Sequence, residues 1–182
     1  IRGIRLSSLV LNVLTVGKLR PLVVFAAVGI FFVDSALLVP DRAPTFAELS
    51  STGLLLVFAF GGYEVIPVPA GEARDPRRAV PFALVMTIVI VTIVMTVVQV
   101  VAVGTLPGLA ASKTPLADAS LLFLGGTGAA LLTLGAVLST TGNNMGQALS
   151  GSRNLYALAE QGDLPGLFGR IHPQFRTPIN AI

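Results

Sequence analysis

A pair of glycines, a glutamate and two prolines interrupt one long apolar stretch of this sequence. The stretch begins at Phe58 and reads FAFGGYEVIPVPAGE. Glycine in a helix interior costs roughly 1 kcal/mol relative to alanine, so Gly61 and Gly62 predict a helix that is broken at about residues 58–64. Backbone groups freed by a break can bind a charged ligand group. A kinked, tightly packed helix is the alternative, but Glu64 favours a binding site, because a carboxylate within a bilayer is costly and usually functional.

A lysine and a polar patch are the other groups in apolar stretches that could bind charge. Lys18 lies about ten residues into its stretch, or roughly 15 Å at 1.5 Å per residue. It could snorkel to the bilayer surface, serve as a fixed ammonium in place of a sodium ion, or face the bundle interior and exchange a proton. The patch LSTTGNNMGQ contains Ser139 and Thr140. It predicts either hydrogen bonds between helices or the wall of a substrate or cation site.

The composition predicts that these groups lie in an all-α integral membrane protein. Hydrophobic residues make up 53% of the chain, charged residues only 12%, and the mean hydropathy is +0.83. Soluble domains usually carry about 25% charged residues. No cysteine is present, which excludes disulfides and cysteine-ligated metals, and His172 alone cannot form a metal cluster. We therefore expect no metal and no cofactor.

Four apolar stretches are long enough to span a bilayer as helices. The predicted spans are about 8–33, 47–69, 82–106 and 119–149, and a further span begins at 177–182. Arginine is concentrated before the first span and in the loops 70–81 and 150–176, whereas the opposite loops carry only Arg42 and Lys113. The positive-inside rule places the arginine-rich loops in the cytoplasm. This topology explains the basic charge without nucleic acid.

Two linked motifs resemble those of a known family. The stretch FAFGGYEVIPVPAGEARDPRRAVP resembles the sixth transmembrane helix and following loop of amino acid permeases in the amino acid–polyamine–organocation (APC) superfamily; the matching positions are Glu64, Glu72, Pro76, Arg78 and Pro81. The stretch SRNLYALAEQGDLPGLFGRIHPQFRTP resembles the loop after the eighth helix, and LNVLTVGKLRPLVVFAAVG resembles the fifth helix, including its lysine. The resemblance covers nearly the whole chain. Because the chain lacks an initial methionine and stops where an apolar stretch begins, we expect it to be the middle of a longer protein.

The resemblance implies a LeuT-like fold of two inverted five-helix repeats, of which the chain holds the last helix of the first repeat and the first three helices of the second. In this fold an unwound sixth helix binds the α-ammonium group of the substrate. That assigns substrate binding to Phe58, Ala59, Gly61 and Gly62. Phe58 takes the place of a gating aromatic residue, and Glu64 matches a carboxylate at the cytoplasmic gate.

The resemblance also implies a role for each remaining polar group. Lys18 matches a lysine proposed to couple proton and substrate movement, and Ser139 and Thr140 lie near the cation region of the eighth helix. The predicted function is therefore a proton-coupled secondary transporter for amino acids that works by alternating access. An exchanger of amino acid for amine without net proton coupling is the alternative, and a membrane scaffold subunit is more remote. An enzyme is disfavoured, because Glu64 and Lys18 alone make no evident catalytic pair.

The expected partners are an amino acid substrate, protons and the lipid bilayer. The sequence shows no acidic cluster near the predicted site, which favours neutral amino acids over dicationic ones. A high arginine and low lysine content suggests a bacterial source, so we expect a multi-pass protein of the plasma membrane, the bacterial inner membrane. Homo-oligomerisation and the identity of the substrate are left open by the sequence.

Overall fold

The computed structural model describes residues 2–40, 42–63, 68 and 75–173. Within these residues the chain is helical and contains no β-strand. The α-helices are α1 (Arg2–Gly29), α2 (Phe46–Phe60), α3 (Pro76–Thr105), α4 (Pro115–Leu121) and α5 (Gly125–Glu160), and the 3-10 helices are η1 (Ile30–Phe32), η2 (Ser35–Leu38) and η5 (Leu109–Ala111). This confirms the prediction of an all-α protein.

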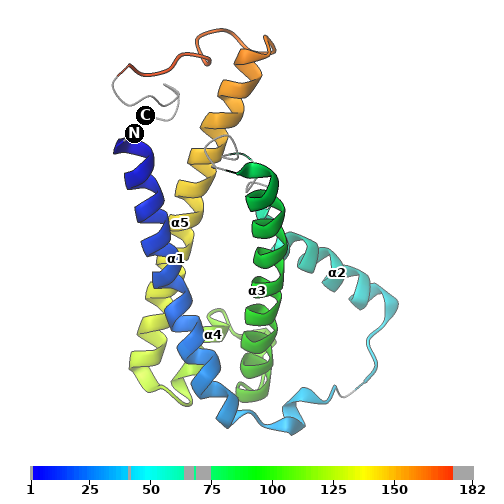
Figure 1. Ribbon diagram of the computed structural model, residues 1–182. Coiled ribbons are helices and arrows are strands. Elements are labelled where there is room, and N and C mark those ends of the chain that lie inside the picture. Colours follow the sequence, from blue (N-terminus) through cyan, green and yellow to red (C-terminus); the bar gives the residue numbers. More distant parts are fainter. Residues whose placement is uncertain (1, 41, 64–67, 69–74, 174–182) are drawn as a thin grey trace.

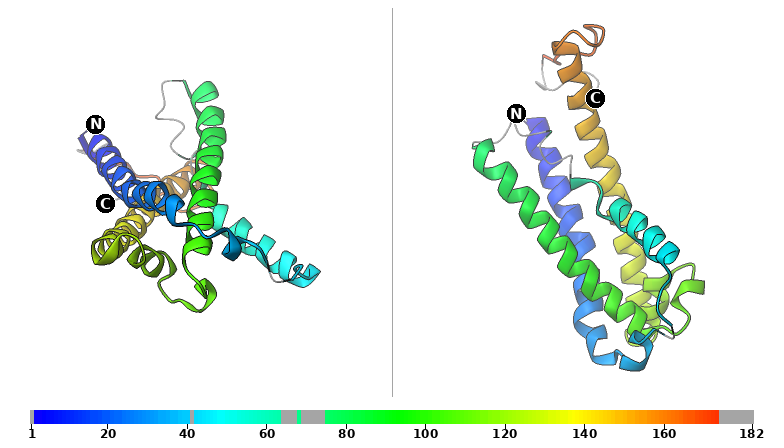
Figure 2. Two further views of the ribbon diagram at one scale, coloured as in Figure 1. Left: turned by 90° about the horizontal axis from the view of Figure 1, so that it is seen from below. Right: turned by 90° about the vertical axis from the view of Figure 1, so that its right-hand side faces the viewer.

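The three longest helices, α1, α3 and α5, form the body of the molecule (Figure 1). α1 and α3 run in the same direction, and α5 runs antiparallel to α1 and lies along it, whereas α2 projects away from the bundle (Figures 1 and 2). The start of α1, the start of α3 and the end of α5 therefore lie at one end of the molecule. In the described part of the chain, the segments Leu9–Phe32 and Pro76–Thr105 are long and apolar enough to cross a membrane.

α3 shows why such an apolar segment forms a helix. It is rich in valine, isoleucine and threonine, which favour strands in water, but only a helix satisfies its backbone groups within a single segment in lipid. Two threonines also bond to their own helix: Thr92 Oγ1 donates to the carbonyl of Ile88 at 2.8 Å, and Thr105 Oγ1 donates to that of Val101 at 2.7 Å. These two hydroxyl groups are thereby satisfied within the helix.

The buried core lies at the end of the bundle opposite the start of α1. Phe25, Val101 and Ala119 are fully buried there, one each from α1, α3 and α4. The ring of Phe123, between α4 and α5, packs against Phe25 with 5.3 Å between ring centroids. Beyond α1, the backbone N–H of Asp34 donates to the carbonyl of Gly104 on α3 at 2.7 Å. These contacts join α1, α3 and α4 at one end, which we call the closed end.

Gly104 lets α3 approach the residues that follow α1. A Cβ added at Gly104 would lie 2.6 Å from Val33 Cγ1 and 3.3 Å from Val33 Cβ. The Gly104 carbonyl also accepts the hydrogen bond from Asp34, so the backbone has little freedom to move away. Small residues at helix contacts in membranes permit this kind of packing.

Replacing Gly104 with alanine is expected to lower the free energy of unfolding by about 1–3 kcal/mol, the usual cost of overpacking. Thermal unfolding of the purified full-length protein in detergent would measure the change. Gly151→Ala is the matched control, because a Cβ at Gly151, also inside a helix, would meet no atom within 4 Å. Equal melting temperatures for the two variants would contradict a tight contact at Gly104.

The helix bounds differ from the predicted spans at α4 and α5. The stretch 119–149 is divided between these two helices by Leu122–Leu124, and Gly125 adopts a positive φ of 66°, which suits glycine. α5 then continues through SRNLYALAE to Glu160 and stops before Gly162, whose φ is 86°. Near this end Tyr156 donates to Glu160 Oε1 at 2.6 Å, and this bond raises the pKa of Tyr156. Which segments cross the membrane stays a prediction.

Candidate functional site

α2 ends where the glycine pair begins. Its start is fixed by a capping box, in which Thr45 and Glu48 satisfy each other's backbone N–H groups. Its last residue is Phe60; the N–H of Gly61 turns back to the carbonyl of Phe58 at 3.1 Å, and Gly62 adopts a φ of 105°. A residue with a Cβ rarely adopts that conformation. The course of the chain at Glu64 and the predicted continuation of the helix lie outside the described residues.

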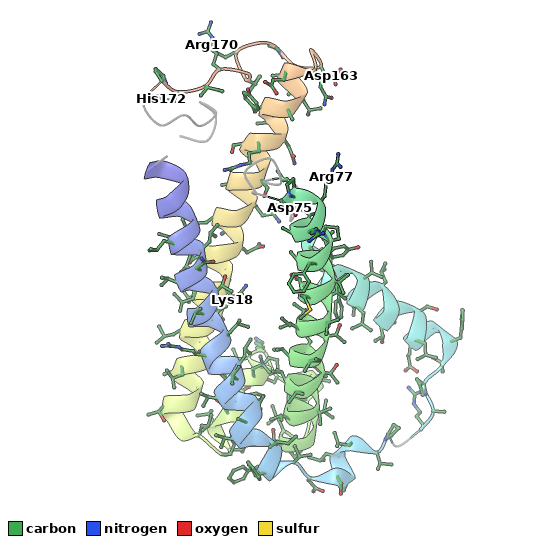
Figure 3. The ribbon with its side chains drawn as sticks, in the orientation of Figure 1. Lys18, Asp75, Arg77, Asp163, Arg170 and His172 are labelled. Atoms are coloured by element: carbon green, nitrogen blue, oxygen red, sulfur yellow. The ribbon has the colours of Figure 1, made fainter. Side chains whose placement is uncertain are left out.

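Lys18 lies near the middle of α1, where its half-buried side chain borders two pockets (Figure 3). The smaller pocket has a volume of about 170 Å³ and the larger one about 450 Å³. Among the described residues that line them, Lys18 is the single residue common to both and the single charged one. Lys18 therefore borders both pockets.

The smaller pocket lies on the side of Lys18 that faces the start of α1. α1 contributes Thr15, one turn before Lys18, and α5 contributes Asn143 and Gln147. Gly62 also lines this pocket, so the non-helical end of α2 reaches the lysine region. The pocket thus combines a cation, a hydroxyl, two amides and a backbone segment outside a helix.

The larger pocket lies on the side of Lys18 that faces the closed end. It is bounded by α1, α4 and α5 and is lined mostly by apolar side chains such as Leu22, Leu116 and Leu132. Two of its hydroxyl groups bond within their own elements: Thr133 Oγ1 donates to the Ala129 carbonyl at 2.8 Å, and Thr114 Oγ1 to Asp118 at 3.0 Å. Ser139 also lines this pocket.

The structure brings together some of the predicted site residues and not others. Lys18 and Gly62 share the smaller pocket, and Lys18 and Ser139 share the larger one. Thr140 lines neither pocket; it is exposed, and its hydroxyl donates to the Ala136 carbonyl of its own helix at 3.0 Å. The other predicted residues on or beside α2 that line neither pocket are Phe58, Ala59 and Gly61, and Phe58 is 87% exposed.

Asn143 and Gln147 belong to the predicted polar patch and line the smaller pocket, although only Ser139 and Thr140 of that patch were assigned to the predicted site. Asn143 and Gln147 follow Ser139 at intervals of four residues, which places all three on one face of a helix. This spacing of four residues within the polar patch is the sequence signal that distinguishes the pocket residues Asn143 and Gln147 from Thr140. In the described part of the chain, no group of three or more histidine, cysteine, aspartate or glutamate residues is placed to hold a metal ion.

Comparison with known proteins places this sequence in a family. The family model described as "Amino acid permease" matches residues 1–182. The chain belongs to the amino acid permease family. The permease is 26% identical over 98% of its length to the methylthioribose transporter of Bacillus subtilis, 27% identical over 99% to the serine/threonine exchanger SteT, and 34% identical over 72% to the aspartate-proton symporter, both of the same organism. The family confirms the resemblance drawn from the two motifs.

The family and the relatives that match the chain are described as permeases, transporters or exchangers and not as enzymes. The permease chain covers 39% of the methylthioribose transporter, 42% of the serine/threonine exchanger and 27% of the aspartate-proton symporter. It therefore spans about two fifths or less of the length of these relatives.

Proposed function

We propose that this chain is the central part of a secondary active transporter for amino acids, with Lys18 as its proton-coupling group. The observation that carries the proposal is the position of Lys18 between two pockets, one of which also contains the non-helical Gly62. A charged residue inside a membrane bundle is energetically costly, and such residues usually have a function. A lysine that borders both pockets could respond to whichever one is open to water.

In this proposal the end of α2 binds the substrate. The broken helix at about 58–64 presents backbone groups of Phe58, Ala59, Gly61 and Gly62 to the amino acid, and Phe58 and Glu64 act as gates. Support comes from the end of α2 at Phe60 and from the positive φ of Gly62. The relatives are more than twice as long as the chain, so the rest of the site is proposed to come from the remainder of a longer, LeuT-like protein.

The proposed topology places the start of α1 in the cytoplasm. Arg77 at the start of α3 and Arg170 beyond α5 lie at the same end of the molecule as the start of α1 (Figure 3). Positive residues gather on the cytoplasmic side of membrane proteins. The smaller pocket would then lie on the inner side of Lys18 and the larger pocket on the outer side, in a multi-pass protein of the plasma membrane.

Two relatives support different coupling schemes. The aspartate-proton symporter is 34% identical to the chain, which favours proton-coupled uptake. The serine/threonine exchanger is 27% identical, which favours exchange without net proton movement as the second candidate. We place the symporter first because the exchange scheme assigns no task to an ionisable Lys18.

The test uses the full-length protein in liposomes. Unlabelled amino acids and amines would compete with a labelled amino acid pool, with and without an inward proton gradient. Accumulation driven by the gradient supports the symporter, whereas uptake only into preloaded liposomes makes the protein an exchanger. Failure of every candidate to compete would contradict an amino acid substrate.

A further inference from the structure

The smaller pocket has the composition of a hydrated chamber. The side-chain amides of Asn143 and Gln147 are exposed and make no hydrogen bond to another described residue. Buried water in proteins typically occupies roomy sites with two to four polar partners. A volume of about 170 Å³ holds several water molecules, since one water takes up about 30 Å³ in the liquid.

The position of this chamber relates it to one face of the membrane. Its lining residues on α1 precede Lys18 and those on α5 follow Ser139. Because the start of α1 and the end of α5 lie at the same end of the molecule (Figure 1), the chamber extends from Lys18 toward the end that carries Arg77 and Arg170. The apolar larger pocket lies in the opposite direction.

We propose that Asn143 and Gln147 hold the water path by which the proton of Lys18 leaves toward the cytoplasm. The inference rests on the proposed function and deepens it. When the chamber opens inward, an N–H bond of the lysine ammonium breaks and a chamber water accepts the proton, which leaves a neutral amine. Water held by the two amides and by Thr15 passes the proton on, and the lysine is protonated again after the transporter reopens outward.

The surrounding charges leave Lys18 as the group that exchanges the proton. On α1 itself, Arg20 is exposed and lines neither pocket. On α3, the charged residues Arg77 and Arg78 are in its first turn, and on α5 the charged residues are Arg153 and Glu160 near its end. Asp118, in the first turn of α4, accepts hydrogen bonds from Ser112 and Thr114. No charged residue among the described residues lining the chamber competes with Lys18 for the proton.

The functional test compares proton-driven uptake with amino acid exchange that moves no net proton. In the full-length protein in liposomes, N143L/Q147L is expected to lower proton-driven uptake at least tenfold and to lower exchange by a clearly smaller factor, since Gly62 lines the same pocket. Serine in place of leucine at position 143 keeps a polar group and leaves room for water. Asn143→Ser should therefore retain part of the proton-driven uptake that N143L/Q147L loses. Asn144→Leu is the matched control, because Asn144 is an exposed neighbour that does not line the chamber.

A second readout measures hydration without relying on transport. The chain contains no cysteine, so Asn143→Cys, Gln147→Cys and Asn144→Cys can be introduced singly into a full-length protein freed of other cysteines. A membrane-impermeant thiol reagent applied from the inside should modify the first two variants at least tenfold faster than Asn144→Cys. Equal modification rates for the three variants would contradict a hydrated chamber at Asn143 and Gln147. Modification of Asn143→Cys and Gln147→Cys only from the outside would contradict a chamber that opens to the cytoplasm.

The transport outcomes separate the inference from the proposed function. Wild-type protein without gradient-driven uptake would refute the proton coupling, and the path with it. If the wild-type protein shows gradient-driven uptake and N143L/Q147L shows the same uptake, the water path is refuted but the proton coupling is not. Equal loss of uptake and exchange in N143L/Q147L would assign the amides to substrate binding and would also refute the path.

Discussion

Replacing Lys18 with alanine is expected to reduce gradient-driven amino acid uptake to the level of protein-free liposomes, while the protein remains in the membrane. The lysine is the single charged residue among the described residues that line either pocket, so no neighbouring group in them can take over the exchange of a proton. Uptake at several external pH values, with the amount of reconstituted protein measured in parallel, would test this. Wild-type uptake with the same pH dependence in Lys18→Ala would refute the coupling role.

Lys18→Arg separates proton exchange from a fixed positive charge. A guanidinium keeps its charge and does not release its proton in proteins. If Lys18 exchanges a proton, the arginine variant should lose coupled uptake as the alanine variant does. If the ammonium only replaces a structural cation, arginine should restore much of the uptake. Arg20→Ala is the control for a general loss of charge on α1, because Arg20 is exposed and borders neither pocket.

Gly62→Leu is expected to weaken substrate affinity by about tenfold or more. The glycine pair predicts a break in the helix, and leucine at such a site would ordinarily be expected to act by overpacking. The structure changes the reason, because a Cβ at Gly62 would meet no atom within 4 Å. The cost comes from the φ of 105°, since left-handed conformations cost other residues about 1–2 kcal/mol. The free variant would relax from this conformation and would have to recover it on binding, and 1.4 kcal/mol is a tenfold change in affinity.

Gly53→Leu is the matched control for that experiment. Gly53 lies within α2, and a Cβ there also meets no atom within 4 Å, but its backbone is helical. The two variants therefore add the same side chain to open space and differ in backbone conformation. Competition binding to the full-length protein would compare them. An affinity for Gly62→Leu equal to that of Gly53→Leu would contradict the proposal that the left-handed conformation shapes the site.

The helices could be predicted because a bilayer leaves few other options. Continuous apolar runs must satisfy their backbone groups internally, so even the valine- and isoleucine-rich residues of α3 form a helix. The break between α4 and α5 was missed because small apolar residues are compatible with a continuous helix. It depends on the conformation at Gly125, which residue type alone does not decide.

The site could be predicted in part. Lys18 and Gly62 stand out in the sequence because a charge and a glycine pair are exceptional in apolar stretches, and both residues line one pocket in the structure. The polar patch was harder, because hydroxyl groups can bond to their own helix, as Thr140 does. Phe58 is 87% exposed, and its proposed role depends on tertiary contacts that residue type cannot reveal.

The hydrogen bond from Asp34, which follows α1 and η1, to Gly104 joins the end of α1 to α3. From that closed end their axes diverge toward the other end of the molecule (Figures 1 and 2). α3 has 30 residues and is therefore roughly 45 Å long at 1.5 Å per residue. A tilt of α3 by about 10° at the closed end would move the start of α3 by roughly 8 Å. A small rotation at the closed end would therefore produce a large displacement at the other end of the molecule.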